Sequence, residues 1–87
     1  MVLAYILLTT RGVDVSEVAE QVIDIEEVSN AHVIYGQYDM IIRVKTNNLE
    51  QLRELNLNKI SKIKGVDATT TLIVADQTNE DDNVVKL

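Results

Sequence analysis

Hydrophobic and polar positions along the chain predict four strands. Residues 2–9, V-L-A-Y-I-L-L-T, are apolar at both alternating sets of positions, as in a strand that is buried on both faces. Residues 31–35 and 38–45 are two further β-type runs, and the Gly36-Gln37 link between them is typical of a β-hairpin. Residues 69–75, T-T-T-L-I-V-A, predict the last strand.

Two segments have the apolar spacing of an amphipathic helix. The first begins at Asp14 or Ser16, with Ser16 as the expected cap, and ends near residue 24. Its predicted buried face is apolar and consists of Val15, Val18, Ala19, Val22 and Ile23.

The second predicted helix is capped by Asn47 or Asn48 and continues to about residue 63. Asn56 interrupts an apolar face formed by Leu49, Leu52, Ile60 and Ile63. Gly65 is expected to end this helix in the left-handed conformation.

The predicted order is strand, helix, strand, strand, helix, strand, which indicates an α+β, ferredoxin-like fold with a four-stranded antiparallel sheet and both helices on one face. Because the first strand is apolar on both sides, the second face of the sheet also needs a cover. We expect dimerisation, sheet to sheet or through strand edges, to provide it.

Composition and charge narrow the class of protein. The chain of 87 residues predicts a single domain, 1–87, with an acidic tail over 76–87 that is either frayed or docked on a neighbour. It has no Cys and one His, which argues against disulfides and against a cysteine or histidine metal site; no cofactor is expected. There is no leader and no membrane-length apolar run, so a soluble cytoplasmic protein is the expectation.

The formal net charge of −6 argues against direct nucleic-acid binding. It is unevenly placed, because residues 12–39 contain acidic side chains and no Lys or Arg, whereas the charged side chains of residues 43–64 are mainly basic. Two interpretations stay open: complementary faces that steer self-association, or two solvated helix faces.

Four segments occur in order over about residues 2–75: A-Y-I-L-L, V-S-N-A-H-V-I-Y-G-Q-Y-D-M-I-I-R-V, L-R-E-L and K-I-K-G-V-D-A-T-T-T-L-I-V. In these segments the chain resembles the ligand-binding module of the Lrp/AsnC transcription regulators, called the RAM module. Full regulators of that family carry a helix-turn-helix domain before this module. The first strand here begins at residue 2, so a stand-alone module without the DNA-reading domain is expected.

The resemblance implies a homo-oligomer, a dimer or a ring of dimers such as an octamer, with an amino-acid effector between dimers. It places the effector's main-chain end at the hairpin turn, Gly36 to Asp39, with help from Thr69 and Thr71. Asp39 suits an ammonium group and Gly36 lets the backbone approach closely, while Tyr35 or Tyr38 could wall the pocket. Loss of Asp39 is then expected to abolish ligand binding and leave the fold intact.

Each of these residues also has an ordinary structural interpretation: a turn glycine, a turn-capping aspartate, β-forming threonines and interface tyrosines. Two alternative functions stay open. One is a ligand-free oligomerisation partner of full-length regulators. The other is a small dimeric α+β barrel enzyme, for which His32 and Asp39 are the titratable candidates.

Overall fold

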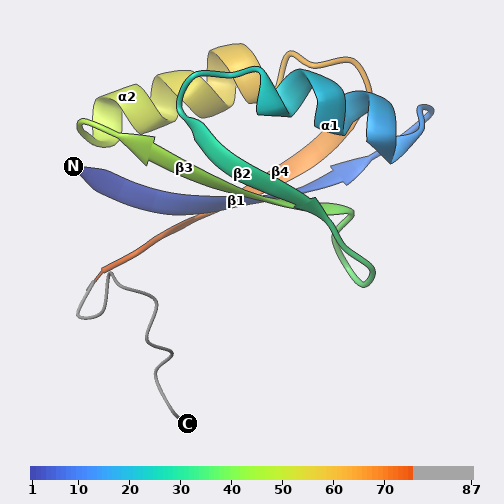
Figure 1. Cartoon of the computed structure of the whole chain (residues 1–87), viewed down its shortest axis with the longest axis horizontal. Coiled ribbons are helices and arrows are strands. Elements are labelled where there is room, and N and C mark those ends of the chain that lie inside the picture. The colour runs from blue at the N-terminus through green and yellow to red at the C-terminus, as the bar shows by residue number, and fades with distance from the viewer. Residues whose placement is uncertain (76–87) are drawn as a thin grey trace, which may run out of the picture.

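The computed structural model describes residues 1–75 as one four-stranded antiparallel sheet with both helices on one face (Figure 1). The strand order is β2-β3-β1-β4. The elements, in chain order, are β1 (Val2–Thr10), α1 (Val15–Ile23), β2 (Val28–Val33), β3 (Met40–Thr46), α2 (Leu49–Glu54), the π-helix η1 (Leu55–Ile60) and β4 (Val66–Ile73). The ferredoxin-like α+β fold is therefore confirmed. The acidic tail, 76–87, lies outside the described residues.

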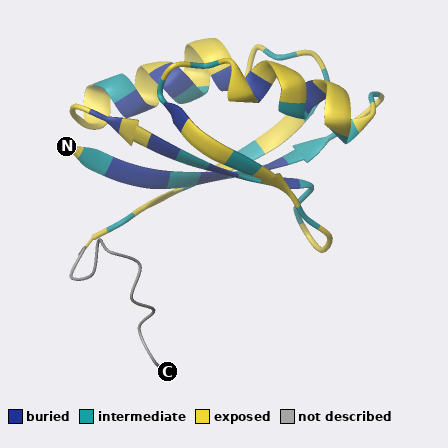
Figure 2. Ribbon diagram, viewed as in Figure 1, coloured by how far each residue is buried: buried dark blue, intermediate teal, exposed yellow. Residues whose placement is uncertain are grey.

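The core lies between the helices and the two central strands, β1 and β3 (Figure 2). Ala4, Ile6 and Leu8 of β1 are fully buried, and the strand register pairs them with Val44, Ile42 and Met40 of β3. The edge strands β2 and β4 are mostly exposed or half-buried. Burial therefore decreases from the middle of the sheet to its two edges.

The start of α1 corrects one sequence prediction. Asp14, not Ser16, is the N-cap: its carboxylate accepts a hydrogen bond from the Ser16 amide at 3.1 Å. The Glu17 side chain accepts from the Asp14 amide in return, which completes a capping box. An ionised cap at this end also interacts favourably with the helix dipole. Val18 and Val22 are buried as predicted, but Ile23 at the last turn is half exposed.

The second helix changes its winding in the middle, which the sequence did not predict. It is capped by Asn48 and is α-helical to Glu54, then becomes a π-helix that ends at Ile60 rather than near residue 63. Regular α-helical spacing would direct Asn56 at the core. The wider π turn instead buries Leu55 and Ile60, five residues apart, and leaves Asn56 half-buried beside them.

Gly65 has φ +100°, so the expected left-handed conformation is present, but the helix has already ended. The glycine leads into β4, and its carbonyl accepts a hydrogen bond from the Arg11 amide at 2.8 Å. A Cβ at this position would overlap the Val13 side chain. Glycine is therefore needed both for the conformation and for the close approach.

Three strands also have boundaries that differ from those predicted. β2 begins at Val28, three residues before its predicted start, and ends at Val33 rather than at residue 35. β3 begins at Met40 rather than at residue 38. β4 spans Val66–Ile73 instead of 69–75. Register shifts in both edge strands, at residues 28–30 and opposite Thr9/Thr10, break the simple alternation from which the boundaries were predicted.

Candidate functional site

The turn between β2 and β3 projects beyond the sheet (Figure 1). A hydrogen bond from the Ile34 amide to the Asp39 carbonyl, 3.0 Å, closes this turn at its base. Tyr35 is fully exposed, at 101%, and Gly36 has φ +139° with no heavy atom within 4 Å of where a Cβ would be. The tip therefore presents an aromatic ring and an uncrowded stretch of backbone to the surroundings.

Asp39 connects the hairpin to the end of β1. Its Oδ2 accepts hydrogen bonds from the Thr10 amide at 2.7 Å and from the Thr10 hydroxyl at 3.3 Å. Its own amide donates to the Leu8 carbonyl at 2.9 Å. The other carboxylate oxygen, Oδ1, has no hydrogen bond within residues 1–75. Asp39 thus has a structural role on one oxygen and a free acceptor on the other.

The predicted threonines do not lie with the predicted tyrosine. Thr69 and Thr71 pair with the buried Leu8 and Ile6, so they share the helix-facing side of the sheet. Tyr38 lies on the opposite side, where its hydroxyl is 3.4 Å from the Thr70 hydroxyl. Thr70 was not among the site residues predicted from the sequence. Because side chains alternate along a strand, Thr70 must face the opposite side of the sheet from Thr69 and Thr71. Only the strand register tells which of these two sides contacts Tyr38.

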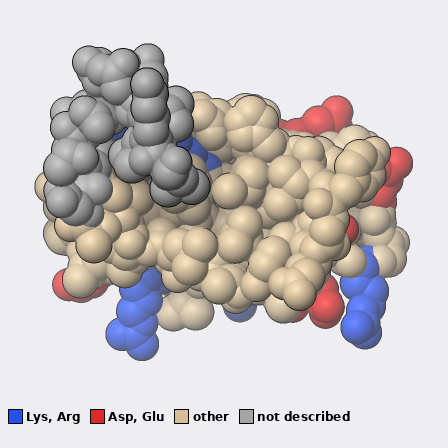
Figure 3. Space-filling view, turned by 90° about the horizontal axis from the view of Figure 1, so that it is seen from below, with Lys and Arg blue, Asp and Glu red and all other residues tan. Residues whose placement is uncertain are grey.

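The sheet side that faces away from the helices is called the outer face here. Its described apolar side chains are Leu3, Tyr5 and Leu7 of β1, Ile41 of β3, Leu72 of β4 and Val74 directly after β4. Figure 3 shows this face from below, and most of its visible area is uncharged. The register nevertheless places two cations on it, Arg43 opposite Tyr5 and Lys45 opposite Leu3. A mainly apolar face of this kind, with its two cations on one strand, is typical of an interaction surface.

His32, the other titratable candidate from the sequence, lies on the edge strand β2. It is exposed, and its imidazole makes no hydrogen bond within residues 1–75. No group of three His, Asp or Glu side chains among the described residues is arranged to hold a metal ion. In the same part of the chain, no helix is long and apolar enough to cross a membrane.

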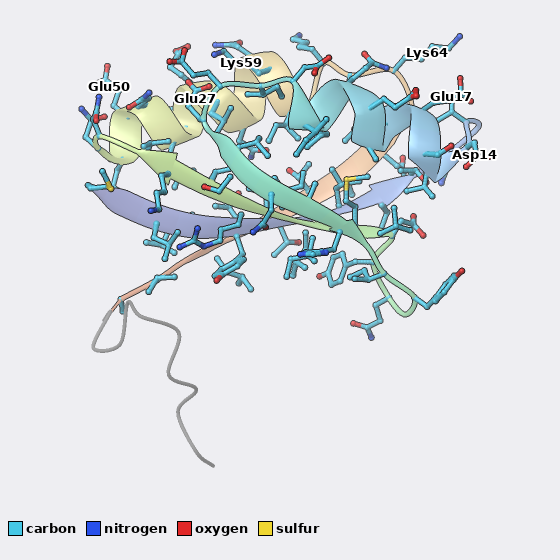
Figure 4. The ribbon with its side chains drawn as sticks, in the orientation of Figure 1. Asp14, Glu17, Glu27, Glu50, Lys59 and Lys64 are labelled. Carbon is cyan, nitrogen blue, oxygen red and sulfur yellow. The ribbon has the colours of Figure 1, made fainter. Side chains whose placement is uncertain are left out.

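One ion pair ties the helix layer together away from the hairpin (Figure 4). The Lys59 ammonium is 3.0 Å from Oε1 of Glu27, which is only 14% exposed, and Gln51 also donates to this carboxylate. Burial acts to raise the pKa of Glu27, but the hydrogen bonds and the charge of Lys59 outweigh it and hold the pKa below its ordinary value. The pair joins η1 to the segment before β2.

Comparison with known proteins gives a consistent result. Residues 3–84 match the family model described as the Lrp/AsnC ligand binding domain. The HTH-type transcriptional regulator FL11 of Pyrococcus furiosus is 34% identical over 73 residues, which are 84% of this chain and 48% of that protein. The chain thus spans about half the length of the curated relatives it matches.

Two solved structures extend the comparison. FFRP-DM1 is 38% identical with a TM-score of 0.81, and the match covers 85% of this chain and 99% of that one. The transcriptional regulator NMB0573 of Neisseria meningitidis, solved as an L-Met complex, has a TM-score of 0.81 over 90% of this chain and 52% of its own. At 16% identity, this second likeness concerns the fold alone.

Proposed function

Because the chain belongs to the Lrp/AsnC ligand-binding domain family, we propose that it binds an amino acid at the β2–β3 hairpin and couples this binding to assembly with further copies. Such a role is regulatory rather than enzymatic, and the curated relatives are named as transcriptional regulators. Cytoplasmic localisation is part of the same proposal.

The hairpin is the observation that carries this proposal. Gly36 leaves the neighbouring backbone amides accessible, and amides in a tight turn suit a carboxylate. Oδ1 of Asp39, which no described residue uses, suits an ammonium group. A zwitterion therefore finds complementary partners within four residues, and the exposed Tyr35 ring supplies apolar surface for its side chain.

This half-site needs a second wall. Tyr35 and Gly36 have no described neighbours on their outer side, so a second copy would have to complete the pocket. The proposed arrangement has two contacts: a dimer that covers the outer face, and a contact between dimers at the hairpin. A ligand held between copies stabilises the assembly by its differential affinity for the assembled state.

The relatives support the ligand class. NMB0573, which shares the fold, is described with bound L-Met. For this chain we propose an amino acid as effector, with full-length regulators of the family as possible partners in a mixed assembly. Which side chain is preferred depends on contacts across the interface between copies.

The test is a thermal-shift screen of the twenty amino acids on the purified chain, with light scattering on each hit. We expect a selective rise in melting temperature, since a ligand that binds only the folded state stabilises it, together with a change in mass. Tyr35→Ala should remove the response without lowering the melting temperature of the free protein, because the side chain is fully exposed. Gln37→Ala in the same turn is the matched control.

A second candidate function is assembly without a ligand. It is favoured by the two hydrogen bonds from Thr10 to the Asp39 carboxylate, which explain Asp39 by a structural role without any ligand. A lack of response to every amino acid at millimolar concentration, with an assembly that depends on the outer face, would support this function and contradict the first.

A further inference from the structure

A groove lies between α2 and the edge strand β4, at the end of the sheet opposite the hairpin tip (Figure 1). Its lining is mainly apolar and comes from both walls: Leu49, Leu52, Arg53, Asn56, Thr71 and Ile73. Its volume of about 270 Å³ is below the range of roughly 300–1,000 Å³ that is usual for small-molecule pockets. An apolar groove of this size suits a few aliphatic side chains of a polypeptide better than a metabolite.

The apolar side chains on the two walls are left partly uncovered by the described residues. The strand register places Thr71 and Ile73 beside Ile6 and Ala4, which are both fully buried. Ile73 is nevertheless 52% exposed, and Leu49 on the helix side is 58% exposed. An apolar segment laid over them is therefore favoured, because it removes their surface from water.

The described part of the chain ends beside this groove. The Val74 amide donates to the Leu3 carbonyl at 2.9 Å, so the chain stays paired with β1 until one residue after Ile73. Residues 76–87 follow Ala75, the last described residue. The nine residues from Ala75 to Val84 span at most about 30 Å when extended. The end of the chain can therefore reach back to the groove from which β4 leaves.

The sequence after Ala75 is divided into a polar stretch and an apolar end. Residues 76–83, D-Q-T-N-E-D-D-N, contain four carboxylates and no hydrophobic residue. Residues 84–87, V-V-K-L, contain all three hydrophobic residues of this segment. Asn, Asp and Thr are common where a chain reverses its direction, and aliphatic side chains gain free energy from burial. The order of the two parts is that of a loop followed by an anchor.

The groove and this segment also have complementary charges. Arg53 lines the groove, and no carboxylate among the described residues lies within 4 Å of its guanidinium. Asp81 and Asp82 lie three and two residues before Val84. A segment whose aliphatic end enters the groove thus brings carboxylates to its rim. An exposed ion pair adds little stability, but it favours one partner over others of the wrong charge.

We propose that residues 84–87 occupy the groove of their own chain, with the acidic residues before them next to Arg53. The aliphatic side chains of this anchor pack on the exposed walls: Val84, Val85 and Leu87 on Leu49, Leu52 and Ile73. The anchor joins α2 to the sheet and lies beside the free edge of β4, which protects that edge from pairing with another chain. Association is then left to the outer face and the hairpin. The inference does not depend on amino-acid binding at the hairpin.

The experiment measures the distance from the end of the chain to the groove. The sequence has no Cys, so Lys86→Cys gives one site for a nitroxide label and keeps every aliphatic side chain of the anchor. The labelled, ¹⁵N-enriched full chain is refolded with an excess of unlabelled parent chain, and the paramagnetic broadening of its amide signals is recorded. We expect strong broadening at Leu49, Arg53 and Ile73, and none at Tyr35 and Gly36. Weak broadening spread over the whole surface, or broadening centred on the outer face, would overturn the proposal.

A triple variant tests the anchor itself. Val84→Ser, Val85→Ser and Leu87→Ser together should abolish the selective broadening at the groove, whereas Gln77→Ser in the polar stretch is the matched control and should keep it. Unchanged amide signals of the buried Ile6 and Ile42 would show that the fold is intact in both.

A mixed sample distinguishes the chain's own anchor from that of a neighbour. When the nitroxide is on one copy and the ¹⁵N label on another, we expect no selective broadening at the groove. Groove signals that broaden only in this mixed sample, or broadening that persists in the triple variant, would contradict the proposal.

Discussion

Replacing Asp39 by alanine removes the acceptor that holds the hairpin against the end of β1. Two bonds are lost, from the Thr10 amide at 2.7 Å and from the Thr10 hydroxyl at 3.3 Å. The hydrogen bond from the amide is short and charge-assisted, whereas the hydrogen bond from the hydroxyl is long. The substitution therefore tests how much stability one well-formed hydrogen bond to a carboxylate contributes.

The expected loss of unfolding free energy is about 1–2 kcal/mol. A hydrogen bond to a charged group contributes roughly 1.5–3 kcal/mol. Both partners are only half-buried, so the Thr10 amide regains part of this from water after the substitution. For a domain of this size, a loss of about 1.5 kcal/mol lowers the melting temperature by roughly 6–12 °C. The fold should therefore stay intact, as expected from the sequence, but with a lower stability.

Urea unfolding followed by circular dichroism at one fixed protein concentration measures the effect, since assembly makes stability depend on concentration. Asp39→Asn keeps an acceptor and loses only the charge, so its loss should be about half as large. Thr10→Val keeps the amide donor and removes the weaker bond, so it should cost less than about 0.5 kcal/mol. An alanine variant as stable as the parent would refute the structural role of Asp39.

The other predictions concern single side chains. Glu27→Gln should make the free energy of unfolding less dependent on pH in the acidic range. The pKa of Glu27 is lowered in the folded state, so its pairing with Lys59 stabilises the fold at neutral pH, and this stabilisation is lost as the pH falls through the folded pKa. In urea titrations the parent and the variant should differ by about 0.5–1 kcal/mol at pH 7 but not at pH 3. Gly12→Ala should cost about 1 kcal/mol of unfolding free energy, and Gly65→Ala should cost more. Both glycines have positive φ, but only Gly65 lacks room for a Cβ; the melting temperatures of the two variants test this order. Asn56→Leu should raise the unfolding free energy by about 1 kcal/mol by removing an unpaired buried oxygen, and an unchanged urea midpoint would contradict this.

Local patterns were sufficient to predict the order of the elements and the fold. The two-sided apolar character of residues 2–9 marked the central strand, and helical spacing marked α1 with its buried Val18 and Val22. The family was also identified correctly from the hairpin and the last strand, because its residues recur in the same order over nearly the whole chain.

What was missed depends on contacts between distant residues. The sequence flagged Asn56 as an interruption of an apolar face, but the π turn that moves it aside is decided by packing on the sheet. Likewise, Asp39 was assigned to the turn, and its bond to Thr10 joins residues 29 positions apart. Whether Thr69 or Thr70 faces the hairpin depends on the register between β1 and β4, which no local pattern contains.

The position of β1 in the middle of the sheet determines how the chain can fold. β1 is synthesised before the other strands of this sheet, and it pairs on one side with β3 and on the other with β4, where Ala4 meets Ile73 almost seventy residues later. Pairings over such long stretches of sequence close large loops and slow the search for the native state, so folding in milliseconds to seconds is expected rather than microseconds. Until β4 has left the ribosome, one edge of an apolar strand has no partner, and nascent chains are then most prone to aggregate.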